Sequence, residues 1–591
     1  MPIPASAPRS TALPEAMTPF GPASAAILAA CVSTLLAYNV PPSSTVLNQA
    51  LAHVGWGIFV AVLCWTSMFS RIRADSGVAS LLAAIGVLVL ASAAAPLWIA
   101  EPTSLAWSAA GTLAVTAVMA VSGAAATASG RLQLAFSSIA WAWLVAGALS
   151  LAVGALQVFA PDWADGDWIA RTGFIGRAVG NLRQPNHLSS LLLWSAVSVV
   201  WLVESGALPR RLAFLLYALM LAGVVMSASR TGMIGVVLLA AWGVMDKSLS
   251  RSTRRLVMLS PAIYVAFWLG LAAWAHDSQH VFGGEARLTA EGDLSSSRFG
   301  IWANTLQLVV QHPWAGVGFG GFNFAWSLTA FPHRPVAFFD HTHNISAQFM
   351  VELGLPLAIF VLALLVHALW RSFVLAKSAS GLDGIALRCA FMMVLMMALH
   401  SQLEYPLWYA YFLLPTAIAF GLCLGRGPDA IEPVRVSRVW SLGFTIAGLL
   451  VAASGILTLY DYMKVVAIFS PTETAAPLPE RIARGQKSWF FSHHADYAAV
   501  TTTDHPSEQM DAFKGATHYL LDTRLMMAWA KAYAERGDLE RARNIAQRLR
   551  EFHNEKSDDF FAECDDAPPS GPERPFQCDP PAKVMGPEDF R

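Results

Sequence analysis

Apolar runs of about 20 residues recur along the first 465 positions of the chain. An α-helix of that length is what the hydrocarbon core of a bilayer requires, because each residue adds about 1.5 Å to a helix. Of the 591 residues, 55% are hydrophobic and only 13% are charged, whereas about 25% of the residues in a typical soluble domain are charged. We therefore predict an all-α polytopic membrane protein.

The predicted spans are about thirteen in number. They lie near residues 22–39, 48–69, 78–99, 106–127, 133–159, 187–203, 212–228, 231–245, 256–275, 345–370, 385–403, 405–424 and 440–464. The net charge of the chain is −1, which excludes the broad basic surface typical of nucleic-acid-binding proteins.

Basic residues follow every even-numbered span, and the positive-inside rule assigns such connections to the cytoplasm. These residues are Arg71, Arg73, Arg131, Arg210, Arg211, Lys247, Arg251, Arg254, Arg255, Arg371, Lys377, Arg426, Arg435 and Arg438. We accordingly predict a cytoplasmic N-terminus and a C-terminal tail on the outer face of the membrane.

This topology divides the chain into three parts. Residues 1–21 form a short cytoplasmic leader, rich in Pro, Ala and Ser, which lacks the compact basic region of a cleavable signal peptide. Residues 22–464 form the membrane domain, whose large outer loop spans 276–344. Residues 465–591 form the outer tail.

The tail contains a helical-hairpin pattern. Apolar residues at helical spacing in 525–534 and 539–552 flank a Gly537-Asp538 turn and resemble one tetratricopeptide unit. Because a single unit cannot bury its own apolar face, we expect it to pack on neighbouring helices or on the membrane domain. Cys564 and Cys578 lie in the polar part of the tail and can form a disulfide in an oxidising compartment.

Several polar residues gather at the start of the span near 345, where a bilayer boundary makes them costly. They are Asp340, His341, His343 and Asn344. A histidine is largely neutral at pH 7 and can accept a proton from a hydroxyl group, so we predict that His343 is a catalytic base, oriented by Asp340 or another carboxylate. The alternatives are a metal site, for which further ligands at a recognisable spacing are missing, and helix capping by Asn344.

Three arginines, Arg183, Arg230 and Arg298, lie in predicted outer segments, where the positive-inside rule does not explain them. A guanidinium group matches phosphate oxygens with paired donors, so the three together predict a diphosphate site. The alternatives for each arginine are a structural ion pair or snorkelling toward the membrane surface.

Two further outer segments contribute polar side chains. Glu404 and Tyr405 form a turn, where Glu404 either binds an acceptor or pairs with one of the arginines. Gln184, Asn186 and His187 either bind sugar hydroxyls or the diphosphate, or serve the next helix, with Asn186 as its cap.

These segments resemble the Wzy/WaaL superfamily of bacterial membrane glycan ligases, polymerases and O-oligosaccharyltransferases. The superfamily pattern places a His, then Asn, Ser or Gln, nine residues and a Gly; here these are His343, Asn344, 345–353 and Gly354. The pattern ends in a small or aromatic residue shortly after this Gly, and this chain has Leu357 there instead. The Arg183-to-Leu188 and Glu404-to-Tyr409 segments are similar to the PglL-type O-oligosaccharyltransferases.

The resemblance implies transfer of a preassembled glycan from undecaprenyl diphosphate to Ser or Thr of periplasmic proteins such as pilins. The close alternative is an O-antigen ligase, whose acceptor is a sugar hydroxyl of lipid A-core, and a glycan polymerase is a third. We expect an inverting displacement that needs no metal or other cofactor, because arginines can neutralise the diphosphate. A transporter of a lipid-linked substrate is the hypothesis from a different class, although it should show internal repeats that this chain lacks.

Overall fold

The computed structural model describes residues 21–70, 75–289, 294–336, 338–425 and 436–565, with 568, 571 and 574–591. Helices dominate this part of the chain, and two-residue strands β1 (Phe69–Ser70) and β2 (Val436–Ser437) pair antiparallel. The all-α prediction is confirmed. Nearly all of the predicted leader 1–21 falls outside the described residues, as do Arg71, Arg73, Arg426 and Arg435.

Each predicted span coincides with a helix, and the ninth corresponds to a helix pair. In chain order these helices are α1 (Pro22–Leu35), α2 (Val46–Thr66), α3 (Ser76–Trp98), α4 (Thr103–Ala128), α5 (Leu132–Phe159), α6 (Pro185–Glu204), α7 (Arg210–Met226), α8 (Arg230–Met245), α9 (Arg251–Met258) with α10 (Ser260–Ser278), α14 (Ile345–Ser378), α15 (Gly381–His400), α16 (Ala410–Leu424) and α17 (Arg438–Phe469).

Not all of these helices are long enough to cross a bilayer alone. Among the described residues, eight meet the length and composition of a membrane span, and the α9–α10 pair, bent by 48°, would be a ninth. Helices α1, α8 and α16 have 14, 16 and 15 residues. A 16-residue helix is only about 24 Å long, less than the roughly 30 Å of hydrocarbon core. The polytopic membrane fold is therefore supported, and the number thirteen stays a prediction.

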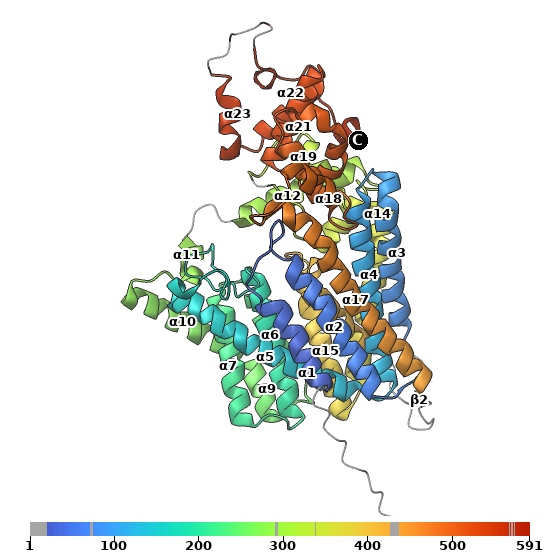
Figure 1. The fold of residues 1–591 in the computed structure, drawn as a ribbon. Coiled ribbons are helices and arrows are strands. Elements are labelled where there is room, and N and C mark those ends of the chain that lie inside the picture. The colour runs from blue at the N-terminus through green and yellow to red at the C-terminus, as the bar shows by residue number, and fades with distance from the viewer. Residues whose placement is uncertain are drawn as a thin grey trace, which may run out of the picture.

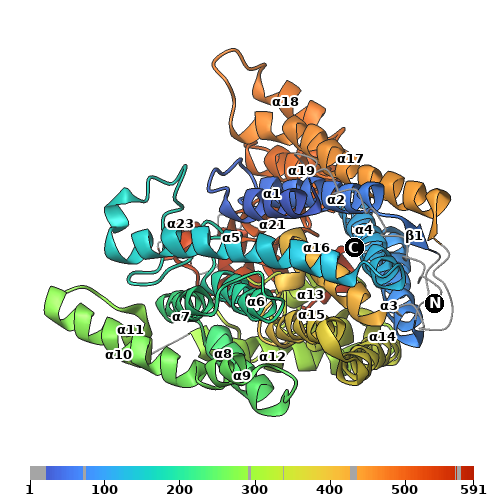
Figure 2. The ribbon, with the colours of Figure 1, turned by 90° about the horizontal axis from the view of Figure 1, so that it is seen from below.

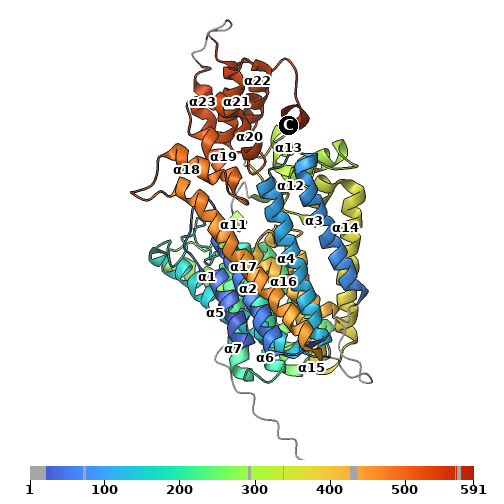
Figure 3. The ribbon, with the colours of Figure 1, turned by 45° about the vertical axis from the view of Figure 1, so that its right-hand side comes forward.

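The membrane helices form one bundle. Figure 2 shows α5 crossing it, with α1 and α2 on one side and α6 and α7 on the other. Figure 3 shows α17 running along α2, and α3 beside α14 at the edge. A side chain at Gly57 of α2 would lie 2.5 Å from the Ala452 nitrogen of α17, so glycine permits this close approach. Buried tryptophans fill the centre, where Trp143 and Trp194 lie 4.8 Å apart.

The region predicted as an outer loop, 276–344, contains helices. Its first residues still belong to α10, and it then forms α11 (Gly283–Thr289), α12 (Leu294–Gln311) and α13 (Phe322–Leu328). Helix α14 begins at Ile345, as predicted, and extends to Ser378 rather than ending near 370. It is broken at Gly354, whose φ of 74° is not helical.

The tail is also helical, as predicted, although α17 extends to Phe469, past the predicted boundary at 464. Its helices are α18 (Leu478–Gly485), α19 (Ser492–Thr501), α20 (Met510–Ala516), α21 (Thr523–Glu535), α22 (Leu539–Arg550) and α23 (Asp558–Ala562). The predicted hairpin corresponds to α21 and α22. Gly537 lies at the turn with a φ of 79°, and Asp538 caps α22 by accepting from the Arg541 amide at 3.2 Å.

The tail stacks on one end of the bundle, above α12 (Figure 1). Its α21 and α22 share a core with α13, in which Phe324 and Trp529 lie 6.3 Å apart. The hairpin thus finds the neighbour that its apolar face needs. Cys564 and Cys578 form a disulfide, and the other four cysteines are free.

Candidate active site

The turn that carries His343 lies where the tail, the α12–α13 region and the start of α14 meet. His343 has a φ of 55°, a left-handed conformation that costs a non-glycine residue free energy. Neighbouring atoms hold the turn: the Thr342 amide donates to Gln348 Oε1 at 2.8 Å, and the Ile345 amide donates to the Ser401 carbonyl at 2.8 Å. Asn344 Nδ2 also donates to the Gln402 carbonyl at 2.9 Å.

Asn344 has the capping role that was the alternative to a chemical one. Its Oδ1 accepts a hydrogen bond from the Ala347 amide at 2.9 Å, which satisfies a backbone donor in the first turn of α14. The cap and the contact with Gln402 together fix the position from which the His343 side chain leaves the backbone.

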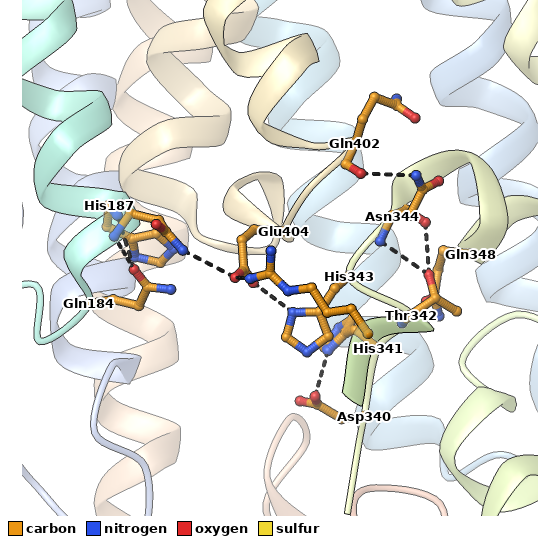
Figure 4. Close-up of polar contacts among 12 residues, drawn as sticks. Gln184, His187, Asp340, His341, Thr342, His343, Asn344, Gln348, Gln402 and Glu404 are labelled. Atoms are coloured by element: carbon orange, nitrogen blue, oxygen red, sulfur yellow. Dashed lines mark hydrogen bonds and ion pairs between the residues drawn. The ribbon is translucent and has the colours of Figure 1, made fainter. Parts of the chain in front are cut away.

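His343 pairs with Glu404. Its Nδ1 lies 2.6 Å from Glu404 Oε2 (Figure 4). No hydrogen-bond partner for Nε2 is found in the part of the chain that the structure describes. A carboxylate at Nδ1 favours the tautomer that carries its proton on Nδ1, which leaves the Nε2 lone pair available to accept a proton.

Of the two predicted alternatives for the group that orients His343, Asp340 or another carboxylate, the structure has the second. Asp340 is exposed, and its Oδ1 lies 2.9 Å from Nδ1 of His341 instead. His341 stacks on Tyr405 with ring centroids 4.6 Å apart. The ring of the same tyrosine also contacts the His343 ring, with centroids 4.9 Å apart. His341 is thus a packing neighbour, and "another carboxylate", Glu404, is the partner of His343.

Glu404 is buried, with only 5% of its surface exposed. One carboxylate oxygen faces His343, while Oε1 accepts from Asn186 Nδ2 at 3.1 Å and pairs with the Arg298 guanidinium. Burial alone would raise the pKa of Glu404, but the hydrogen bond and charge of His343 and the charge of Arg298 outweigh it and lower the pKa below its ordinary value. Glu404 is therefore a carboxylate, and the predicted Glu–Arg pair is confirmed with Arg298 as its arginine.

Asn186 connects Glu404 to the turn before α8. Its Oδ1 accepts from Ser229 Oγ at 2.6 Å, and Ser229 caps α8 through the Gly232 amide at 3.0 Å. The capping alternative for Asn186 is wrong: Gln184 Oε1 accepts from the Asn186 and His187 amides and caps α6. Because Pro185 occupies the first helical position, the cap falls on the residue before it.

The three predicted diphosphate arginines differ in their surroundings. Arg298 contacts Glu404, and Arg230 is exposed at the first residue of α8, next to Ser229. Arg183, with a φ of 56°, directs its guanidinium toward backbone carbonyls of the α1–α2 connection, those of Ala37 and Ser44. Arg298 thus contacts Glu404 directly, Arg230 follows Ser229 of the Asn186 network in sequence, and Arg183 contacts the backbone of another connection.

His187 and Tyr405 differ in their surroundings. His187 is only 3% exposed, and its Nδ1 lies 3.1 Å from the Tyr411 hydroxyl, inside the bundle. A direct contact between His187 and an acceptor is therefore not available in this arrangement. Burial raises the pKa of Tyr405 well above its ordinary range, so its hydroxyl keeps its proton beside His343.

Two residues of the site were not singled out from the sequence. Gln348 holds Thr342 and also donates to Glu352 Oε1 at 3.0 Å, and Gln402 contacts both Asn344 and Ser346. Gln348 follows the cap Asn344 by one helical turn, a spacing that points it back to the same turn. That spacing was the available signal.

An apolar cavity of about 490 Å³ lies between α12 and α14, beside the His343 turn. The two are joined by the Trp302 Nε1 hydrogen bond to the Thr342 carbonyl at 2.9 Å. The cavity is lined by Trp302, Thr305, Leu306, Val309, Val310, Pro313, Ala347, Met350 and Leu355.

Three family models match the chain. "Protein glycosylation ligase" matches residues 178–203, "O-Antigen ligase" matches 215–362, and "Virulence factor membrane-bound polymerase, C-terminal" matches 389–563. These ranges contain Arg183 to His187, Arg230, Arg298, the His343 turn and Glu404.

Two relatives from Acinetobacter baylyi are similar to the chain. A general O-oligosaccharyltransferase is 27% identical over 285 residues, which cover 46% of this chain and 49% of the relative. A ComP-specific O-oligosaccharyltransferase is 25% identical over 299 residues, which cover 49% and 51%. The chain thus matches about half the length of these curated relatives. By these matches, the chain is similar to the O-antigen ligases, the membrane-bound polymerases and the protein glycosylation ligases of the Wzy/WaaL superfamily.

Proposed function

We propose that the protein is a glycosyltransferase that moves a preassembled glycan from undecaprenyl diphosphate to Ser or Thr hydroxyls of a periplasmic protein such as a pilin. The observation that carries this proposal is the 2.6 Å contact of His343 Nδ1 with the buried carboxylate of Glu404, which leaves Nε2 to act as a base. The names of the two relatives support the reaction class.

In the proposed reaction, Nε2 of His343 takes the proton of the acceptor hydroxyl as its oxygen attacks the anomeric carbon. A C–O bond to the acceptor forms, and the bond from the anomeric carbon to the diphosphate oxygen breaks. The lipid diphosphate leaves with the electron pair, and the anomeric carbon is inverted by this single displacement. Glu404 stabilises the imidazolium that forms, because its negative charge lies next to Nδ1.

The diphosphate leaving group needs positive charge as it departs. Arg298, which pairs with Glu404, and Arg230, which follows Ser229 of the same hydrogen-bonded network, are the first choices for this role, with Arg183 as the third member of the set. The apolar cavity between α12 and α14 suits the first isoprene units of the donor. No metal or other cofactor is required, so we expect full activity after exhaustive EDTA treatment; loss of activity that only a metal restores would contradict this.

The site belongs on the periplasmic side of the inner membrane. The His343 turn and the tail lie at the same end of the bundle. The Cys564–Cys578 disulfide in the tail supports this side, because disulfides persist in the periplasm and are rare in the cytosol. Both the cytoplasmic N-terminus and the periplasmic C-terminus are parts of the proposal.

A second candidate function is that of an O-antigen ligase, favoured by the match of that family model to residues 215–362. The chemistry at His343 would be the same, and the acceptor would be a sugar hydroxyl of lipid A-core. The polymerase match at 389–563 adds glycan polymerisation as a third, more distant candidate.

Co-expression separates these functions. The chain is expressed with a lipid-linked glycan pathway and a candidate pilin in a ligase-deficient host. A glycan mass on the intact pilin supports the proposal, whereas a modified lipopolysaccharide ladder supports the O-antigen ligase. Neither product, in a host where a known O-oligosaccharyltransferase modifies the same pilin, would contradict the proposal.

The His343→Ala variant separates an enzyme from a transporter of the same lipid. We expect transfer to fall by about 10²–10⁴-fold, because the general base is lost. Binding of the lipid-linked donor should persist, since the arginines and the apolar cavity are unchanged. Transfer at the wild-type rate would remove His343 from the mechanism.

A further inference from the structure

Asn323 joins the tail to the loop that leads into His343. It lies in α13 and is 3% exposed. Its Nδ2 donates to the Phe339 carbonyl at 2.7 Å, and its Oδ1 accepts from the Leu521 amide of the tail at 2.8 Å. One buried carboxamide thus uses its donor on the loop and its acceptor on the tail.

A chain of aromatic contacts runs beside this bridge. Phe552, at the end of α22 and fully buried, stacks on Phe338 with ring centroids 3.9 Å apart. Phe552 also contacts Trp326, which contacts Phe339 at 5.7 Å. Phe339 in turn lies edge-to-face with the His343 ring at 5.7 Å. The tail therefore reaches the imidazole through two rings.

Arg334 closes the same junction. Its guanidinium carbon lies 4.6 Å from the Phe552 ring centroid and 5.0 Å from that of Trp326. Its NH1 donates to the Trp326 carbonyl at 2.6 Å, and its Nε lies 3.6 Å from Glu551 of the tail. The side chain is 1% exposed, so this cation belongs to the interior of the junction.

The His343 turn needs such support from outside. A left-handed non-glycine residue persists only where the surrounding structure holds it, since the relaxed conformation has lower energy. Gln348 accepts from the amide of Thr342, directly before His343, and the 401–402 segment holds the side of the turn after His343. Asn323 and the aromatic chain hold the side before it.

We propose that the tail supports the chemical step through its junction with α13, where Asn323 is a positioning residue that holds the His343 turn in its reactive conformation. The inference rests on the proposed function and deepens it, because it assigns the tail a role in the chemical step. Binding of the lipid-linked donor does not depend on this bridge.

The Asn323→Asp variant tests this bridge with almost no change of volume. A carboxylate still accepts from Leu521 but cannot donate to Phe339, whose carbonyl then faces another oxygen. A displacement of about 1 Å is enough to lower the rate of a chemical step about a hundredfold. We expect kcat to fall by about tenfold to a hundredfold, with the KM for the donor within about twofold of wild type.

Asn544 provides the matched control. It is 1% exposed, and its carboxamide also bridges two segments: it donates to the carbonyls of Glu540 and Lys583 and accepts from the Met585 amide, each at 2.9 Å. These partners all lie within the tail. Asn544→Asp should therefore lower the melting temperature without lowering kcat per folded molecule.

The full chain is purified in nanodiscs, and transfer is measured against pH for wild type, N323D and N544D, normalised to the donor-binding fraction. The acid limb of the kcat/KM profile should move only in N323D, because only there does the His343–Glu404 contact loosen. If N323D does not fold, Phe338→Leu, which removes the stack on Phe552, should show the same loss of kcat. If the test variant, N323D or F338L, has the same kcat as the control N544D, the positioning role is overturned. No transfer by the wild type with any donor would instead contradict the proposed function.

Discussion

Two carboxylates lie near the histidine pair, and each one contacts a different ring. Glu404 is buried and faces His343 at 2.6 Å, whereas Asp340 is exposed and faces His341 at 2.9 Å. A buried carboxylate has a stronger electrostatic effect on its partner than an exposed one, because water screens it less. Glu404, which contacts the ring directly, is therefore better placed than Asp340 to stabilise an imidazolium at position 343.

This difference predicts unequal effects of two conservative substitutions. Glu404→Gln keeps the volume but removes the charge that stabilises the His343 imidazolium, so kcat should fall by about 10²–10⁴-fold. Asp340→Asn should change kcat by less than about fivefold, because Asp340 does not contact His343. Steady-state transfer to an acceptor protein measures both, and a larger loss in D340N would return the orienting role to Asp340.

Helix α14 follows the His343 turn directly, and its break at Gly354 sets the direction of its N-terminal part. Gly354 has a φ of 74°, and a side chain there would lie 2.4 Å from the Trp314 carbonyl oxygen. Leu355 beyond the break donates its amide to the Pro313 carbonyl at 2.8 Å. The glycine of the family pattern is thus required by the close passage of the 313–316 backbone.

Gly354→Ala should disturb the site from a distance of eleven residues along the chain. The added methyl group and the left-handed φ should together cost about 2–4 kcal/mol of stability and displace the start of α14, so transfer should fall at least tenfold. Gly111→Ala inside α4 is the control: beyond the adjacent residues and the local helix backbone, no heavy atom lies within 4 Å of the new methyl group, and helix propensity favours alanine there. Thermal unfolding and transfer rates of both variants provide the comparison, and a fully active G354A would show that the break is dispensable.

Local sequence patterns predicted where the helices lie, but they did not predict which side chains come into contact. The spans could be found because apolar length alone marks them, and Asn344 could be recognised as a cap because capping acts within four residues. Helix α12 was missed, since its polar residues interrupt the apolar run that marks a span. The His343–Glu404 contact joins positions 61 residues apart, which no local pattern encodes. The sequence therefore left the choice between Asp340, which is close in the chain, and another carboxylate open.

At the scale of the whole molecule, histidines line the contact between the tail and the bundle. His493 Nδ1 lies 3.2 Å from Ser104 Oγ at the start of α4, and His518 Nε2 lies 3.2 Å from the Ile99 carbonyl. His494 lies 6.4 Å from the ring of Phe469 at the end of α17 and also packs among Phe491, Tyr519 and His493 of the tail. Burial lowers the pKa of His494 and of His518 to about 4, with the charge of Arg591 adding to the shift at His518.

These shifts predict that the tail loosens in acid. A histidine whose pKa is about 6.5 when exposed and about 4 when docked favours the docked state fully above pH 6.5. As the pH falls from 6.5 toward 4, the undocked state binds protons that the docked state excludes, so stability is lost. At pH 5 each of the two histidines should cost on the order of 2 kcal/mol.

The consequence for catalysis follows from the junction at Asn323. If the docked tail holds the His343 turn, then transfer should fall reversibly between pH 6.5 and pH 5, together with a lower melting temperature and faster proteolysis between α17 and α18.

His494→Phe keeps an aromatic ring in the contact and removes its titration, so it should reduce the loss of stability at pH 5. His505→Gln, at a tail histidine whose side chain is 73% exposed, should leave the loss unchanged. An equal loss of stability at pH 5 in wild type and H494F would show that His494 does not control the docking of the tail.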